Sequence, residues 1–62
     1  MKLKELREEN NISQTDLAKI LNIKQNTYSQ YETGKRQLPI DTLIKLAKFY
    51  KTTTDYILGL ED

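Results

Sequence analysis

The chain contains neither cysteine nor histidine, and in a chain of 62 residues this absence limits how a stable fold can form. A domain of this size buries only about 60% of the surface that its unfolded chain exposes, so its hydrophobic core is thin. Many small domains gain stability from disulfides or a structural zinc ion, but the usual Cys and His ligands are missing here. The fold must therefore come from close packing of its secondary structure elements alone.

The same absence restricts the functions that the chain can have. Cysteine nucleophiles, Ser-His-Asp triads and histidine general bases all require residues that are missing, and so small a chain has little room for a pocket beside its core. We therefore expect no enzymatic activity, cofactor, metal or small-molecule ligand site. No apolar run approaches the roughly 20 residues that span a bilayer, and the acidic N-terminal segment is not a signal peptide. These features favour a cytoplasmic protein without a membrane partner.

Apolar residues recur at helical spacing, and only two glycines and one proline interrupt them. This pattern predicts five helices: about residues 2–9, 13–21, 24–33 and 39–50, and a short one between a cap within 52–55 and Gly59. Ser13 is predicted to cap the second helix, and Pro39 to lie in the first turn of the fourth. The predicted helix ends are Asn10-Asn11, Asn22, Gly34 and Gly59, because Asn and Gly tolerate the left-handed backbone conformation.

The second and third predicted helices are joined by a short turn and form a helix-turn-helix unit. Asn22 suits the left-handed position in such a turn, and the small Ala18 allows the two helices to approach closely. The apolar residues that would lock the pair are Leu17, Leu21, Ile23, Tyr28 and Tyr31. We expect Ile20 to join the apolar face of the second helix. In the fourth helix, we expect an apolar face of Ile40, Leu43, Ile44, Leu46 and Ala47.

The third predicted helix divides into two faces at about 100° per residue. Thr27, Tyr28 and Tyr31 fall on one side, which we expect to be buried. The opposite side is an arc of uncharged hydrogen-bonding side chains, namely Gln25, Asn26, Ser29, Gln30 and Thr33. Solvated helix faces are usually rich in Glu and Lys, so this arc indicates a binding surface, with a plain polar face as the alternative.

Amide side chains on an exposed helix suit DNA, because the major groove admits a helix and Gln or Asn can pair with adenine N6 and N7. The side chains expected to read bases are Lys24, Gln25, Asn26, Ser29 and Gln30. Phosphate contacts are expected at the start of the second helix and in the loop after the third, from Gln14, Thr15, Lys35 and Arg36. Residues 17–40 carry a net charge of +3, which favours an anionic partner.

Several pieces of the sequence resemble the Cro/phage-repressor family of helix-turn-helix regulators, also called the XRE family. They are Ser13-Gln14 with Leu17-Ala18, Tyr31-Glu32 with Gly34-Lys35-Arg36, and the run Thr54-Asp55-Tyr56-Ile57-Leu58-Gly59. The resemblance covers the chain and implies an all-α, compact five-helix lambda-repressor-like domain over residues 1–62, with its helix-turn-helix motif at about 13–33. It also implies sequence-specific binding to double-stranded DNA, usually by a homodimer on an inverted repeat that represses transcription.

The resemblance also carries over to single residues. It implies that Gln14 contacts phosphate, and that an ion pair between Arg7 and Glu32 fixes the recognition helix. It places the base contacts at Gln25, Asn26, Ser29 and Gln30. The chain departs from the family where Asn11 and Asn22 replace a common glycine, and where Pro39 falls one residue later than the usual proline.

The sequence leaves two points open, namely the kind of partner and the place of the dimer interface. The same fold also serves as a protein-interaction module, as in an antitoxin or an adaptor, and the amide face would then contact protein. The dimer interface is also undetermined, and the apolar end of the chain is the candidate: Tyr56, Ile57, Leu58 and Leu60.

Overall fold

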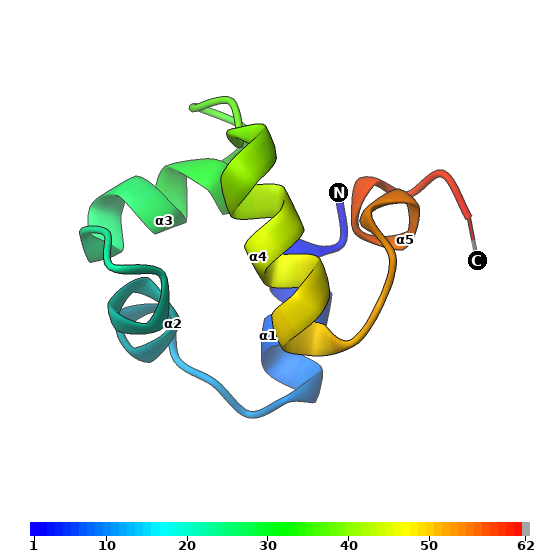
Figure 1. Cartoon of the computed structure of the whole chain (residues 1–62). Helices are drawn as coiled ribbons and strands as arrows, with labels where there is room; N and C mark the ends of the chain where they lie inside the picture. The colour runs from blue at the N-terminus through cyan, green and yellow to red at the C-terminus, as the bar shows by residue number, and fades with distance from the viewer. Residues whose placement is uncertain (62) are drawn as a thin grey trace.

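The computed structural model describes residues 1–61 (Figure 1). These residues form five helices and no strands. The helices are α1 (Leu3–Glu9), α2 (Gln14–Leu21), α3 (Gln25–Thr33), α4 (Ile40–Tyr50) and α5 (Thr54–Leu58). The predicted all-α class and the order of five helices are thereby confirmed. In Figure 1, α2 and α3 lie at one end of the molecule and α5 at the other, with α1 and α4 between them.

Side-chain caps start two of the helices. The N–H of Asp16 donates to Ser13 Oγ at 3.0 Å, as the sequence predicts for α2. The N–H of Tyr56 donates to Thr53 Oγ1, also at 3.0 Å, and so caps α5. Each cap satisfies a backbone donor that the first turn of a helix leaves without an intrahelical partner. Pro39 differs slightly from its prediction: it precedes α4 with extended backbone (ψ 150°) instead of lying in the first turn.

Left-handed residues end or follow the helices where the sequence predicts them. Asn11 and Asn22 have φ of 56° and 59°, and Gly34 and Gly59 have φ of 78° and 83°. Asn therefore does occupy the positions in which the family often has Gly. Lys51, at the end of α4, also has a positive φ of 56°, and the sequence gives no signal for it. Lysine carries a Cβ that disfavours this conformation, so this helix end is strained.

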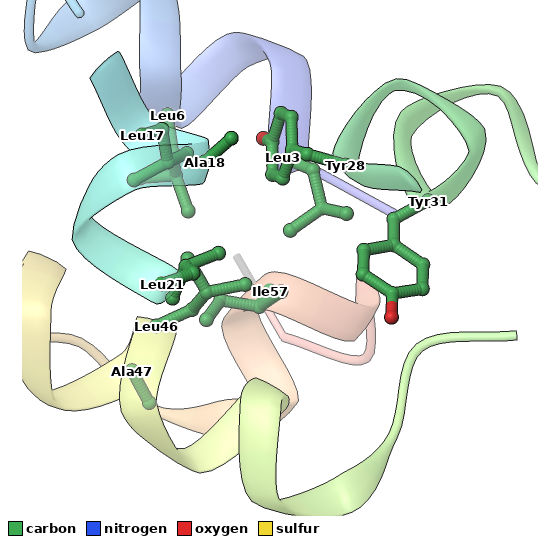
Figure 2. Packing of buried hydrophobic residues seen from close by; sticks show 10 residues of the cluster. All are labelled: Leu3, Leu6, Leu17, Ala18, Leu21, Tyr28, Tyr31, Leu46, Ala47 and Ile57. Atoms are coloured by element: carbon green, nitrogen blue, oxygen red, sulfur yellow. The ribbon is translucent and has the colours of Figure 1, made fainter. Parts of the chain in front are cut away.

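The hydrophobic core receives side chains from all five helices (Figure 2). Tyr28, Leu17, Leu46 and Ile57 are fully buried. The remaining core residues are Leu3, Leu6, Ala18, Leu21, Tyr31 and Ala47. Because α3 contributes two tyrosines to this core, its orientation is fixed by the same packing that holds the domain together.

Three apolar residues expected in the core are exposed instead. Ile20 is 53% exposed, Ile40 is 74% exposed and Ile44 is 42% exposed. Ile20 lies on the edge of α2, because the neighbouring helices already cover the side that carries Leu17, Ala18 and Leu21. Ile40 and Ile44 are one turn apart on α4 and lie at the edge of the face that buries Leu46 and Ala47, and the described neighbours leave this edge exposed.

The N-terminus is fixed to the last helix. The Lys2 N–H donates to the carbonyl oxygen of Ile57 at 2.8 Å, and the Lys2 ammonium lies 4.9 Å from the centre of the Tyr56 ring. These contacts hold α5 beside the start of α1. None of the helices in the described part of the chain is both long and apolar enough to pass through a bilayer.

The strained end of α4 leads to a stability prediction. We expect Lys51→Gly to raise the free energy of unfolding by about 0.5–1 kcal/mol, because glycine adopts φ near 56° without a Cβ clash. Chemical denaturation measures the change. The matched control is Lys48→Gly, which places the same substitution inside α4 and should lower stability by about 1 kcal/mol. A loss of stability in both variants would contradict the prediction.

Candidate nucleic-acid interface

The turn between α2 and α3 is short and closed by backbone hydrogen bonds. Asn22 adopts the left-handed conformation, and the N–H of Ile23 donates to the carbonyl oxygen of Ala18 at 2.9 Å. Ala18 is only 2% exposed, so the two helices meet closely at this small residue. The turn therefore sets the angle at which α3 leaves α2.

The two faces of α3 differ as the sequence predicts, except that Thr27, expected on the buried side, is only half-buried. Tyr28 and Tyr31 are 0% and 6% exposed and form the inner face. Gln25 and Asn26 are exposed, and Ser29 and Gln30 are half-buried, on the outer face. Lys24 is exposed immediately before the helix. The structure thus places four of the five predicted base-reading residues on α3, whose inner side is packed into the core, and the fifth, Lys24, immediately before it.

An ion pair ties α3 to α1. The Arg7 Nε donates to Glu32 Oε2 at 2.7 Å, and Arg7 Nη1 donates to the carbonyl oxygen of Ile12 at 2.9 Å. The side chains of Arg7 and Glu32 are 13% and 5% exposed, so water screens this pair weakly. The pair implied by the family resemblance is present, and it also fixes the loop between α1 and α2.

Glu32 holds a second partner from α2. Gln14 Nε2 donates to Glu32 Oε1 at 3.1 Å, and Gln25 Nε2 donates to Gln14 Oε1 at 2.8 Å. A continuous hydrogen-bonded chain therefore runs from Arg7 through Glu32 and Gln14 to the exposed Gln25. The sequence predicts roles for each of these residues but not their connection, because residues 7, 14, 25 and 32 meet only in the folded chain.

The carboxylate of Glu32 determines how both amides point. An ionised carboxylate can only accept hydrogen bonds, so Gln14 must turn its Nε2 toward Glu32 and its Oε1 toward Gln25. Gln25 must then offer an N–H to Gln14. After these bonds, Gln25 keeps its Oε1 and one N–H for a ligand, and Gln14 keeps one N–H.

Glu32 remains charged in this environment. Burial favours its neutral form, but the hydrogen bonds from Arg7 and Gln14 outweigh burial, so the pKa of Glu32 lies below the ordinary value of 4.5. Nearby, the buried Tyr28 hydroxyl also helps to lower the pKa of Glu32, whereas the buried Tyr50 hydroxyl lacks a hydrogen-bond partner among the described residues. Burial raises the pKa of Tyr50 to about 12, so this residue stays neutral beside the ion pair. The Glu32 side chain is only 5% exposed, so little water competes for its hydrogen bonds.

The loop after α3 turns back to contact the helix through Arg36. Gly34 ends the helix, and the chain returns so that the Arg36 N–H donates to the carbonyl oxygen of Gln30 at 3.2 Å. The Arg36 Nε also donates to Gln30 Oε1 at 2.8 Å. Among the predicted phosphate contacts, Arg36 therefore lies against a predicted base reader, while Lys35 and Thr15 are exposed.

The expected dimer interface needs a correction. Ile57 is fully buried and belongs to the core, so it cannot form part of a contact surface. Tyr56 is half-buried, whereas Leu58 and Leu60 are 38% and 73% exposed. The sequence places all four together because a five-residue helix carries too little periodicity to separate its inner side from its outer side.

Comparison with known proteins reveals relatives along nearly the whole chain. A family model described as "Helix-turn-helix" matches residues 3–57. The chain is 41% identical over 61 residues to "HTH-type transcriptional regulator ImmR" of Bacillus subtilis, covering 98% of this chain and 48% of that protein. It is 40% identical over 60 residues to "HTH-type transcriptional regulator AnsR" of the same organism, covering 97% and 52%.

A phage protein is also similar. The chain is 39% identical over 49 residues to "Cryptic phage CTXphi transcriptional repressor RstR" of Vibrio cholerae, covering 79% of this chain and 44% of that protein. The chain thus spans about half the length of the curated relatives it matches. No solved structure matches it significantly.

The charged network leads to a prediction of pH-dependent stability. Glu32→Gln should lower the free energy of unfolding by about 3 kcal/mol at neutral pH, because it leaves Arg7 without its anion in a mostly buried site. A carboxylate whose pKa is lowered by folding stabilises the fold at pH values above its ordinary pKa. This contribution is lost as the pH falls through the folded-state pKa. The difference between wild type and variant should therefore shrink on acidification below about pH 4.5.

Denaturant titrations across the acid range measure this effect. The matched control is Glu9→Gln, which makes the same chemical change at an exposed residue of α1 and should alter stability by less than about 0.5 kcal/mol. An equal loss in the two variants, or a difference for Glu32→Gln that does not change with pH, would refute the role given to Glu32.

Proposed function

The chain belongs to the helix-turn-helix family, and from this membership and the outer face of α3 we propose that it binds double-stranded DNA and regulates transcription. The proposed domain takes in residues 1–62, with its helix-turn-helix motif at about 13–33. The observation that carries the proposal is the hydrogen-bonded chain that ends at Gln25. It presents an oriented amide on an exposed helix whose inner face is held in the core. The names of several relatives, as transcriptional regulators or repressors, support the same function.

The outer face of α3 fits the chemistry of the major groove. Gln25 keeps one acceptor and one donor after binding Gln14, and adenine offers the complementary donor N6 and acceptor N7. Asn26 and Ser29 add further donors and acceptors along the same side, and Lys24 can reach a guanine at the start of the helix. We therefore propose that α3 reads base edges, with adenine opposite Gln25.

Phosphate contacts would hold α3 in its register. Gln14 keeps one N–H, and it opens α2 beside Thr15, where the first backbone N–H groups lack intrahelical partners. Lys35 is exposed just after α3 and supplies a positive charge near the groove edge. These contacts position the domain on DNA without discriminating between sequences.

A single domain of this size binds DNA weakly, because one such module buries only roughly 600–1,000 Å². We propose that two copies bind an inverted repeat with half-sites about one helical turn apart, and that occupancy of this operator represses transcription. The exposed Leu58 and Leu60 remain candidates for the contact between copies.

Selection of duplexes from a random pool tests the proposal directly. We expect the protein to recover a palindromic site, and its affinity for that site to fall steeply as salt is raised because phosphate binding releases counterions. A random duplex provides the control for non-specific binding. Failure to enrich any duplex, together with salt-independent binding to a protein partner, would instead support an interaction module of the antitoxin or adaptor kind.

Two substitutions separate base reading from phosphate binding. Gln25→Ala should cost about 1–3 kcal/mol on the selected site and relax the preference for adenine at one position. Lys35→Ala should weaken binding to all duplexes alike and reduce the salt slope by about one.

The control for both is Lys48→Ala, which replaces an exposed lysine in the last turn of α4. This end of α4 lies away from α3 (Figure 1). Its affinity and specificity should match those of the wild type. A change of sequence preference in Lys35→Ala, or a uniform loss in Gln25→Ala, would reverse the roles assigned to these two residues.

A further inference from the structure

Gln25 and Gln30 lie at opposite edges of the polar arc of α3, and different atoms of their amides are occupied. Gln25 uses an N–H to bind Gln14 and keeps its oxygen free. Gln30 does the opposite: its Oε1 accepts from Arg36 Nε at 2.8 Å, so its two N–H groups are left for a ligand. The two glutamines therefore present different hydrogen-bonding patterns to a molecule that binds this face.

The contact between Gln30 and Arg36 is supported by the backbone. Gly34 has a φ of 78° and turns the chain back at the end of α3, and the N–H of Arg36 then donates to the carbonyl oxygen of Gln30 at 3.2 Å. This bond fixes the start of the Arg36 side chain beside Gln30. The guanidinium has no carboxylate partner in the described part of the chain, so its charge is available to an anionic or electron-rich ligand.

We propose that Gln30 and Arg36 together read one base pair as a donor-only unit that selects guanine. This inference rests on the proposed function and assigns Arg36 to base recognition instead of to phosphate. Guanine offers two acceptors, N7 and O6, on its major-groove edge, and both Gln30 and Arg36 supply only donors there. Adenine at this position would place its N6 amino group against those donors, and cytosine would do the same with N4.

The recognition code of α3 then differs along its length. Gln25, oriented through Gln14 and Glu32, presents the donor and acceptor that match adenine. Gln30, oriented by Arg36, presents donors that match guanine. Arg36 lies outside the helix and determines specificity in two ways: its Nε orients the Gln30 amide, and its remaining N–H groups add donors of their own.

The experiment compares binding of the full chain to the selected duplex and to duplexes in which each base pair of one half-site is replaced. Anisotropy titrations give a dissociation constant for each duplex. The position read by Gln30 is identified as the base pair at which the single substitution Gln30→Ala relaxes the sequence preference. In the wild-type protein, we expect guanine to be favoured over adenine there by about tenfold or more, the size of a good bidentate contact.

Arg36→Ala frees Gln30 Oε1, which lets the amide rotate and accept from adenine N6. We expect the guanine preference at the Gln30 position to fall to near parity, without further loss in the Gln30→Ala/Arg36→Ala double variant. Arg36→Lys keeps the charge but loses the Nε contact, so it should not restore the preference. The matched control is Lys35→Ala, which should lower affinity for every duplex by the same factor. Circular dichroism establishes that each variant is folded.

Uniform weakening of all duplexes by Arg36→Ala, restoration by Arg36→Lys, or selection of adenine opposite Gln30 would overturn the inference while leaving the proposed function intact. Failure of the wild-type protein to enrich any duplex would overturn both. A loss of guanine preference that is shared by Gln30→Ala and Arg36→Ala at one position supports the donor-only unit.

Discussion

The organisation of this domain depends on the interactions of the Glu32 carboxylate. This carboxylate is almost entirely buried and accepts hydrogen bonds from Arg7 of α1 and Gln14 of α2, although it belongs to α3. Arg7 extends the connection to the loop after α1 through the carbonyl oxygen of Ile12. One charged group therefore joins three helices, and removal of Arg7 or of Glu32 would leave the charge of the other unpaired in a mostly buried site. The thin core of a chain of 62 residues that has no cysteine to form a disulfide is supplemented in this way.

The same carboxylate connects stability to the proposed function. Since an ionised carboxylate only accepts, its charge determines the orientation of Gln14 and, through Gln14, of Gln25. An amide that is already oriented loses less conformational freedom when it meets a base than one that rotates freely in water. The inner tyrosines of α3 act in the same direction, because Tyr28 and Tyr31 prevent the helix from turning about its axis. Recognition by α3 would thus begin from a surface that the fold has already arranged.

The fold follows from local signals in the sequence to a large extent. Caps such as Ser13, left-handed turns at Asn22 and Gly34, and the buried tyrosines of α3 are all encoded within a few neighbouring residues. Predictions of burial are wrong where the outcome depends on how helices pack. Ile20, Ile40 and Ile44 have helical spacing, but the described neighbours leave them exposed. Lys51 adopts its left-handed conformation because the chain must turn there, against its own preference.

For the candidate site, the sequence predicts which residues take part but not how they are connected. Residue type alone gives Gln25 and Gln30 the same hydrogen-bonding capacity, with two donors and one acceptor each. What distinguishes them is the partner: an amide from α2 that is itself fixed by a buried anion, or a guanidinium from the loop beyond α3. These partners are eleven and six residues away in sequence, and neither belongs to α3. The amino-acid sequence of α3 alone therefore does not determine which bases the helix selects, because the surrounding fold decides which atom of each amide remains free.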